Sequence, residues 1–114
     1  MQYQVVIQLS SADFTIHKGM LDQISNLLND LDDIKVEVVV HEEAYPFLLE
    51  NSYFNLHVLD LQKRAVQFYV CENTMNAQHL IKSDFIPEVE MVSSGVAHIV
   101  KRQSEGWAYL KAGF

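Results

Sequence analysis

The chain has 114 residues, a formal net charge of −7, 49% hydrophobic residues and 20% charged residues. This length suits one core, so we expect a single domain over residues 1–114. The composition is typical of globular rather than disordered proteins. The negative charge has the wrong sign for holding a phosphate backbone, which argues against nucleic acid as a partner.

The cysteine content and the hydropathy predict the compartment. Cys71 is the only cysteine, so no internal disulfide can form and we expect a reducing cytoplasm. Residues 1–7 lack a basic region, and their apolar run is too short for a signal peptide. No stretch approaches the ~20 apolar residues of a membrane span, so we expect no membrane partner.

The first part of the chain predicts a strand, a helix and a second strand. Residues 3–9 are rich in β-branched and aromatic side chains, which favours a strand. Residues 14–31 carry apolar side chains at spacings of three and four, the pattern of an amphipathic helix. Residues 34–41 alternate and then become wholly apolar, which predicts another strand. This order implies a parallel pair with a right-handed crossover.

The segment after the second strand is less regular. We interpret residues 41–43 as a solvated loop because of their charge. Pro46 suits the first turn of a short helix. Residues 53–63 predict a further helix, since Lys63 at its end is a cation that suits the C-terminal helix dipole.

The segment around Cys71 carries most of the chemical information. Residues 66–70 form an apolar run that predicts a strand buried on both faces. Residues 75–80 predict a short helix, with Asn73 or Thr74 as its cap. Cys71 would then lie at a strand end and near a helix N-terminus, whose partial positive charge favours the thiolate. An unpaired cysteine is also often a small buried hydrophobe, and position alone leaves both interpretations open.

The C-terminal part predicts a strand, a helix and a final strand. Residues 88–92 form the strand, and residues 107–110 form the last one. Gly106 can end the helix between them in a left-handed conformation. That helix would place three apolar side chains on one face, namely Val96, Ile99 and Val100.

Together these elements predict an α/β fold of three layers, with a mostly parallel five-stranded sheet and helices on both faces. Ligands of such sheets bind in the crevice outside the C-terminal strand ends. A histidine beside a cysteine at that rim favours nucleophilic sulfur chemistry, because an imidazole can promote or pair with a thiolate. Their adjacency depends on the strand order, and a lone strand-end histidine is otherwise a local hydrogen-bond partner. The residues expected at the rim are Ser10, Ser11, His41, Cys71, Asn73, Thr74, Ser93 and Ser94.

Other kinds of site lack their motifs. The histidines and the cysteine show no zinc-ligand spacing. Residues 10–13 contain no glycine, which excludes a dinucleotide fingerprint and a P-loop. We therefore expect no metal and no cofactor. Without a second cysteine an intramolecular dithiol cycle cannot operate, so Cys71 would need a small thiol, another subunit or another protein.

Two segments resemble a known family. Residues 71–75, Cys-Glu-Asn-Thr-Met, are similar to the Cys-x-Asn-Thr signature of the DsrE/DsrF-like family. Residues 88–109 resemble the family's ending, a strand, a small-residue turn into Gly-Val, a helix and Gln-x-Glu-Gly-aromatic-Ala-Tyr. The resemblance implies a three-layer α/β subunit that forms trimers or hexamers. The better understood relatives pass sulfur as a persulfide on a cysteine that matches Cys71, so the resemblance implies the same role for Cys71. Similar proteins carry a Gly-Pro-Gly-like turn where residues 42–46 of this chain form a bulky acidic segment.

Two functions follow from these observations. In the first, the protein is a sulfurtransferase-like sulfur carrier that exchanges sulfur with a donor or acceptor protein. Cys71 would hold a persulfide, and His41, Asn73 and the amides after Cys71 would stabilise it. In the second, a non-enzymatic homo-oligomer binds a small ligand or a partner, and Cys71 is structural. An acyl- or nucleotide-handling enzyme has no supporting motif. Several large side chains would either lie in a subunit interface or complete the core, namely Phe47, Tyr53, Phe54, Trp107, Tyr109 and Phe114.

Overall fold

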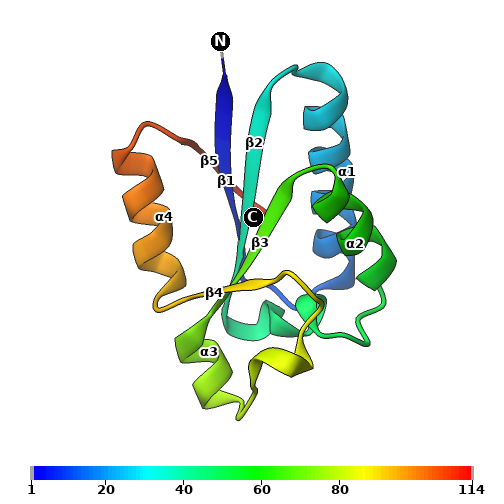
Figure 1. Ribbon diagram of the computed structural model, residues 1–114, viewed down its shortest axis with the longest axis vertical. Helices are drawn as coiled ribbons and strands as arrows, with labels where there is room; N and C mark the ends of the chain where they lie inside the picture. Colours follow the sequence, from blue (N-terminus) through cyan, green and yellow to red (C-terminus); the bar gives the residue numbers. More distant parts are fainter. Residues whose placement is uncertain (1, 114) are drawn as a thin grey trace.

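The computed structural model describes residues 2–113 and confirms the expected three-layer α/β fold (Figure 1). Its five-stranded sheet has the order β4-β3-β2-β1-β5, and every neighbouring pair is parallel. The strands are β1 (Tyr3–Leu9), β2 (Ile34–Val40), β3 (Val66–Cys71), β4 (Glu90–Val92) and β5 (Ala108–Lys111). The helices are α1 (Phe14–Asp30), α2 (Asn55–Lys63), α3 (Glu72–Ala77) and α4 (Gly95–Ser104), with the 3₁₀ helices η1 (Glu42–Leu48) and η2 (Lys82–Asp84).

The two faces of the sheet are covered unequally. Helices α1 and α2 lie on one face and α4 lies alone on the other (Figure 1). Because successive strand residues point to opposite faces, Val5, Ile7 and Leu9 join the main core, whereas Val6 packs under α4. The apolar contact under α4 is small, with Val6, Val39 and Ile99 at its centre and the partly buried Tyr69 and Trp107 packed against it.

Helix α3 begins earlier than the sequence predicted. It starts at Glu72, directly after β3, and Cys71 is its N-cap residue. The prediction that Asn73 or Thr74 caps it is therefore wrong, since both lie within its first turn. The helix ends at Ala77, and His79 has a positive φ of 56° that turns the chain away.

The segment after β2 is also more ordered than predicted. His41 is buried, and Glu42 and Glu43 open the 3₁₀ helix η1, so residues 41–43 are not a loop, although both glutamates are solvent-exposed as predicted. Pro46 lies inside η1 instead of in the first turn of a later helix. Burial of Phe47 and two other apolar side chains of η1 holds this segment against the core.

Two further corrections concern the C-terminal part. Strand β4 begins at Glu90 rather than at residue 88, because Glu88 has a positive φ of 71° and belongs to the preceding turn. Of the three apolar side chains predicted for one face of α4, only Ile99 is buried, whereas Val96 and Val100 are each 56% exposed. The predicted end of α4 is confirmed, since Gly106 follows it with φ +93°.

The large side chains considered for a subunit interface divide into two groups. Phe47 and Phe54 belong to the core, and Trp107 is partly buried under α4. Tyr53 and Tyr109 are exposed in the single chain. Phe114 lies outside the described residues. Among residues 2–113, no helix has both the length and the apolar character needed to cross a membrane.

Candidate functional site

Strand order brings the predicted histidine and cysteine together. Strands β2 and β3 are neighbours, and Val40 lies opposite Val70 in their register. His41 and Cys71 are the next residues of these two strands, so they leave the sheet side by side at the C-terminal rim. The adjacency that the sequence left open therefore exists.

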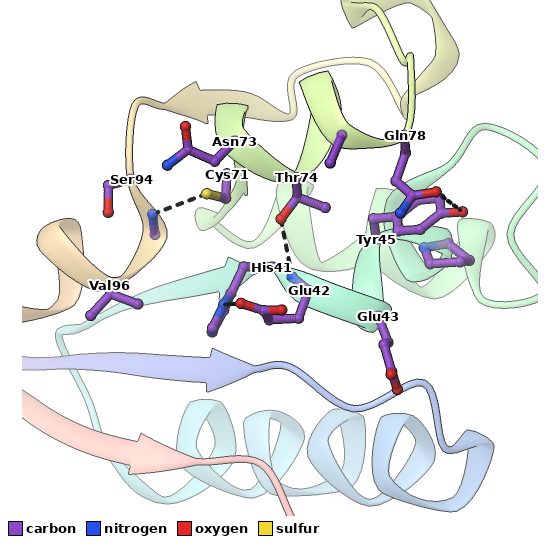
Figure 2. A pocket seen from close by; sticks show the side chains of 13 residues that line it. His41, Glu42, Glu43, Tyr45, Cys71, Asn73, Thr74, Gln78, Ser94 and Val96 are labelled. Carbon is purple, nitrogen blue, oxygen red and sulfur yellow. Dashed lines mark hydrogen bonds and ion pairs between the residues drawn. The ribbon is translucent and has the colours of Figure 1, made fainter.

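The Cys71 sulfur lies against the N-terminus of α4. Its Sγ accepts the backbone N–H of Gly95, with 3.4 Å between nitrogen and sulfur (Figure 2). Ser94 caps the helix there, because its Oγ accepts the Ala97 N–H at 3.2 Å. N-terminal helix amides stabilise negative charge, so this contact favours charge on the sulfur.

Gly95 permits this close approach because it has no side chain. A Cβ at that position would lie 3.1 Å from Val39 Cγ1 and 3.5 Å from the Cβ atoms of both Cys71 and His41. The backbone at the start of α4 therefore packs directly against Cys71 and His41, with no side chain between them. Any larger residue would displace the amide from the sulfur.

His41 is buried and has a polar neighbour at each ring nitrogen. Its Nε2 lies 2.9 Å from the Gln8 Nε2. Its Nδ1 lies 3.7 Å from a carboxylate oxygen of Glu42 (Figure 2). The backbone N–H of His41 donates to the Leu9 carbonyl at 3.1 Å, which continues the pairing of β2 with β1. The ring is therefore held by both β1 and the start of η1.

The segments η1 and α3 form the other wall. Glu42 has a left-handed φ of 56°, which is uncommon for a residue with a side chain, and its N–H donates to the Thr74 hydroxyl at 3.1 Å. Further along, the Tyr45 hydroxyl donates to the Gln78 Oε1 at 3.3 Å. These two contacts tie η1 to α3 across the space in front of Cys71.

The space enclosed in this way, the Cys71 cavity, has a volume of about 480 Å³. Its polar groups are the Cys71 thiol, the His41 imidazole, hydroxyls, amides and the carboxylates of Glu42 and Glu43, and none of the residues 2–113 that line it is a lysine or arginine. It is lined by His41, Glu42, Glu43, Tyr45, Pro46, Cys71, Asn73, Thr74, Ala77, Gln78, Ser94, Gly95 and Val96. It can hold a small ligand or an extended segment against the sulfur.

The structure gathers five of the eight predicted site residues at this cavity, namely His41, Cys71, Asn73, Thr74 and Ser94. Ser93 borders a separate hollow beside α4. Ser10 and Ser11 do not line the cavity, because the chain after β1 turns into α1; the Ser11 Oγ accepts the Asp13 N–H at 3.0 Å there.

Sequence reasoning missed some residues of the site. Gly95 could have been found from its place after two serines at the start of a helix, where a close approach is common. Gln8 carries a weaker signal, as a polar side chain in an otherwise apolar half of β1. Within residues 2–113 no group of three or more His, Cys, Asp or Glu side chains is arranged to hold a metal ion.

A second polar group, the Glu37 cluster, lies on the same sheet face and consists of Glu37, Tyr69, His98 and Arg102. Arg102 donates to both Glu37 carboxylate oxygens at 2.8 and 2.9 Å. His98 Nε2 lies 2.7 Å from one of them, and the Tyr69 hydroxyl donates to the other at 3.3 Å. The cluster lies four residues before His41 along β2, or about 13 Å at 3.3 Å per residue.

Three groups of the Glu37 cluster have shifted pKa values. Burial alone raises the pKa of Glu37, but hydrogen bonds from Arg102 and His98 outweigh it and hold the pKa below its usual value. Burial and then the Glu37 charge raise the pKa of Tyr69. The hydrogen bond to Glu37 raises the pKa of Arg102. Glu37 is therefore a buried carboxylate whose charge is balanced by α4.

Solved structures match this fold along almost the whole chain. The protein of unknown function MTH1491 from Methanobacterium thermoautotrophicum is 34% identical, with a TM-score of 0.95 over 96% of this chain and 99% of the other. The ychN protein from E. coli is 12% identical, with a TM-score of 0.80 over 97% and 99% of the two chains. The protein of unknown function BT1422 from Bacteroides thetaiotaomicron is 9% identical, with a TM-score of 0.75 over 95% and 93%. The last two show likeness of fold alone.

Sequence comparison agrees with the structural one. No curated protein matches the chain. The model of the DsrE/DsrF-like family matches residues 21–112, which include β2, β3, both walls of the Cys71 cavity and α4. The chain belongs to the DsrE/DsrF-like family.

Proposed function

We propose that this protein carries sulfur as a persulfide on Cys71. One observation carries the proposal, namely that the Cys71 Sγ accepts the Gly95 N–H at 3.4 Å and borders an open cavity at the strand rim. A thiolate is the reactive form of cysteine, and this amide stabilises its charge. Membership of the DsrE/DsrF-like family, in which relatives relay sulfur, supports the same chemistry.

The transfer requires no net oxidation. The Cys71 thiolate attacks the outer sulfur of a donor persulfide, a bond forms between that sulfur and Sγ, and the S–S bond of the donor breaks. The donor leaves as a thiolate, and the transferred sulfur arrives with its proton, which it releases to solvent to give the persulfide anion and regains before the next transfer. A thiolate of the acceptor then attacks the outer sulfur on Cys71, takes it as a persulfide and restores the Cys71 thiolate.

The cavity provides groups that suit a bound persulfide. His41, Asn73 and Thr74 line it beside Cys71 and offer N–H and O–H donors to an anionic outer sulfur. Because Cys71 is the only cysteine, the acceptor is a small thiol or another protein. Free thiols persist in a reducing compartment, so we expect the protein to act in the cytoplasm.

A second candidate function rests on the burial of Cys71. The residue is only 6% exposed, as expected for a structural cysteine. In this alternative the protein is a non-enzymatic homo-oligomer, and the cavity binds a small ligand or a partner protein without covalent chemistry.

Intact mass spectrometry separates the two functions. The folded protein is exposed to a small-molecule persulfide donor, with Cys71→Ser as the matched control. A gain of sulfur that is reversed by a reductant and absent from the control supports the sulfur carrier. A Cys71 that stays unmodified when folded and reacts only after denaturation contradicts it and leaves the binding protein.

We also propose that the protein is a homo-oligomer, a trimer or a hexamer. Apolar side chains are exposed on the outer face of α4 and on the edge strand β5, including Val96, Val100 and Leu110. Val96 also borders the Cys71 cavity, so a subunit packed there would lie beside the sulfur. Light scattering at micromolar concentration tests this, and a monomer would refute it.

A further inference from the structure

The His41 ring is held by a chain of polar side chains that starts on β5, an edge strand of the sheet. The Tyr109 hydroxyl on β5 donates to the Gln8 Oε1 on β1. The Gln8 amide nitrogen then faces the His41 Nε2 at 2.9 Å. Tyr109 and Gln8 lie on the neighbouring strands β5 and β1, and His41 directly follows the next strand, β2, so the sheet itself fixes their order.

The two ends of the Gln8 amide are chemically distinct. Its oxygen can only accept, and its nitrogen can only donate. With the oxygen occupied by the Tyr109 hydroxyl, the nitrogen is directed at His41. A neutral imidazole carries one N–H and one acceptor nitrogen, so a donor facing Nε2 requires Nε2 to be the acceptor.

The other ring nitrogen agrees with this assignment. The His41 Nδ1 lies 3.7 Å from a Glu42 carboxylate oxygen, and a carboxylate only accepts. A proton on Nδ1 therefore faces a negative charge, whereas a lone pair there would be repelled by it. Both neighbours of the ring favour the tautomer with the proton on Nδ1.

We propose that Gln8, oriented by Tyr109, is a positioning residue that fixes His41 in the Nδ1–H tautomer. Resting on the proposed function, this gives His41 a defined role at the Cys71 cavity. The proton on Nδ1, on the Glu42 side of the ring, is then the only N–H that a neutral His41 can offer to the anionic outer sulfur of a Cys71 persulfide. His41 therefore acts there as a donor, and its Nδ1 cannot act as a general base.

Nitrogen-15 NMR of the histidine rings tests the assignment without any sulfur donor. At mildly alkaline pH we expect a pyridine-like Nε2 and a pyrrole-like Nδ1 for His41, identified by the signal that His41→Gln removes. A pyrrole-like Nε2 in the wild-type protein overturns the inference, whatever Cys71 does with sulfur.

Two substitutions sharpen the test. Gln8→Glu keeps the size of the side chain but replaces the donor by an acceptor, so Nε2 must become the protonated nitrogen. Tyr109→Phe removes the hydroxyl that holds the amide oxygen, so the Nε2 signal should move part of the way in the same direction. Gln4→Glu is the matched control. It adds the same charge on the same face of β1, four residues away from Gln8, and should leave the His41 signals unchanged. An unchanged Nε2 in Gln8→Glu overturns the proposal.

The functional readout is the lifetime of the sulfur adduct on Cys71. In Gln8→Glu we expect it to shorten by about tenfold, the effect of one hydrogen bond to a charged group. Gln4→Glu should retain the wild-type lifetime. If the tautomer reverses but the lifetime does not change, His41 does not act on the sulfur and its proposed donor role is overturned. If Cys71 forms no adduct in any variant, the sulfur-carrier function fails while the tautomer assignment stands on the spectra.

Discussion

The Glu37 cluster and the Cys71 cavity are two polar regions on one face of the sheet, and α4 contributes to both. The second half of α4 supplies His98 and Arg102, which hold the Glu37 carboxylate. The first residue of α4, Gly95, donates its N–H to the Cys71 sulfur. In the Glu37 cluster the charged and hydrogen-bonding groups partner one another, whereas the Cys71 cavity leaves a thiol and several hydrogen-bond donors facing open space.

The shifted pKa values belong to the Glu37 cluster. The shifted groups, Glu37, Tyr69 and Arg102, are all in the cluster without a cysteine, and their causes are burial and one another. Perturbed pKa values accompany both catalytic sites and structural ion pairs. We infer that the Glu37 cluster fastens α4 to a sheet face with little apolar contact, and that this fastening positions Gly95 against Cys71.

The largest expected effect is on stability after removal of the Glu37 carboxylate. Glu37→Ala leaves Arg102 and His98 without their partner under α4. We expect the free energy of unfolding to fall by about 3 kcal/mol, the lower end for breaking a buried ion pair, because the Arg102 side chain is 26% exposed. Urea denaturation measures it. The control is Glu90→Ala. Glu90 is an exposed residue of β4 that lies opposite Tyr69 of β3, and its removal should change the free energy of unfolding by less than about 0.5 kcal/mol. Equal losses in the two variants would break the contrast between the regions.

The pH dependence of stability tests the same cluster without removing a side chain. The folded-state pKa of Glu37 lies below the ordinary value of 4.5, so the folded protein binds its proton less readily than the unfolded chain. The resulting stabilisation is fully present above that ordinary value and is lost as the pH falls through the lower folded-state value. Chemical denaturation at a series of acidic pH values should show this loss. Glu37→Gln should flatten the profile, and an unchanged slope would exclude Glu37 as its origin.

Substitution of Gly95 connects the two regions. Gly95→Ala places a Cβ 3.1 Å from Val39 Cγ1, so α4 must shift by a few tenths of an ångström. We expect a loss of about 1 kcal/mol and slower alkylation of Cys71 in the folded protein, because the amide moves away from the sulfur.

Gly19→Ala is the matched control for that experiment. Gly19 lies in α1 with nothing within 4 Å of an added Cβ, so alanine should raise stability by about 0.5–1 kcal/mol. The rate of Cys71 alkylation should stay at the wild-type value. An alkylation rate that is the same in Gly95→Ala and wild type would mean that the Gly95 amide does not activate the sulfur.

The smallest expected effect concerns the backbone of the cavity wall. Glu42 has φ +56°, a conformation that costs a residue with a side chain about 1 kcal/mol. Glu42→Gly should therefore raise the unfolding midpoint slightly, whereas Glu43→Gly, where no positive φ requires glycine, should lower it. Thermal unfolding of both variants provides the measurement. A fall in both would show that the Glu42 carboxylate stabilises the site more than its backbone strains it.

The sequence by itself determined the elements whose signals are local. The apolar spacing of α1, the wholly apolar end of β2 and the left-handed Gly106 after α4 all follow from neighbouring residues, and the structure has them. The family signature around Cys71 likewise marked a segment that borders the Cys71 cavity. Such features need no knowledge of distant contacts, because side-chain periodicity and backbone preference act within a few residues.

Only the tertiary structure decided what depends on strand order and burial. Strand order put His41 beside Cys71 and Gln8 beside His41, and packing of α4 brought the Gly95 amide to the sulfur. Burial of η1 against the core overrode the charge of residues 42–43, which had favoured a loop. These contacts join residues 24 to 33 positions apart, where the free energy of packing outweighs any local preference.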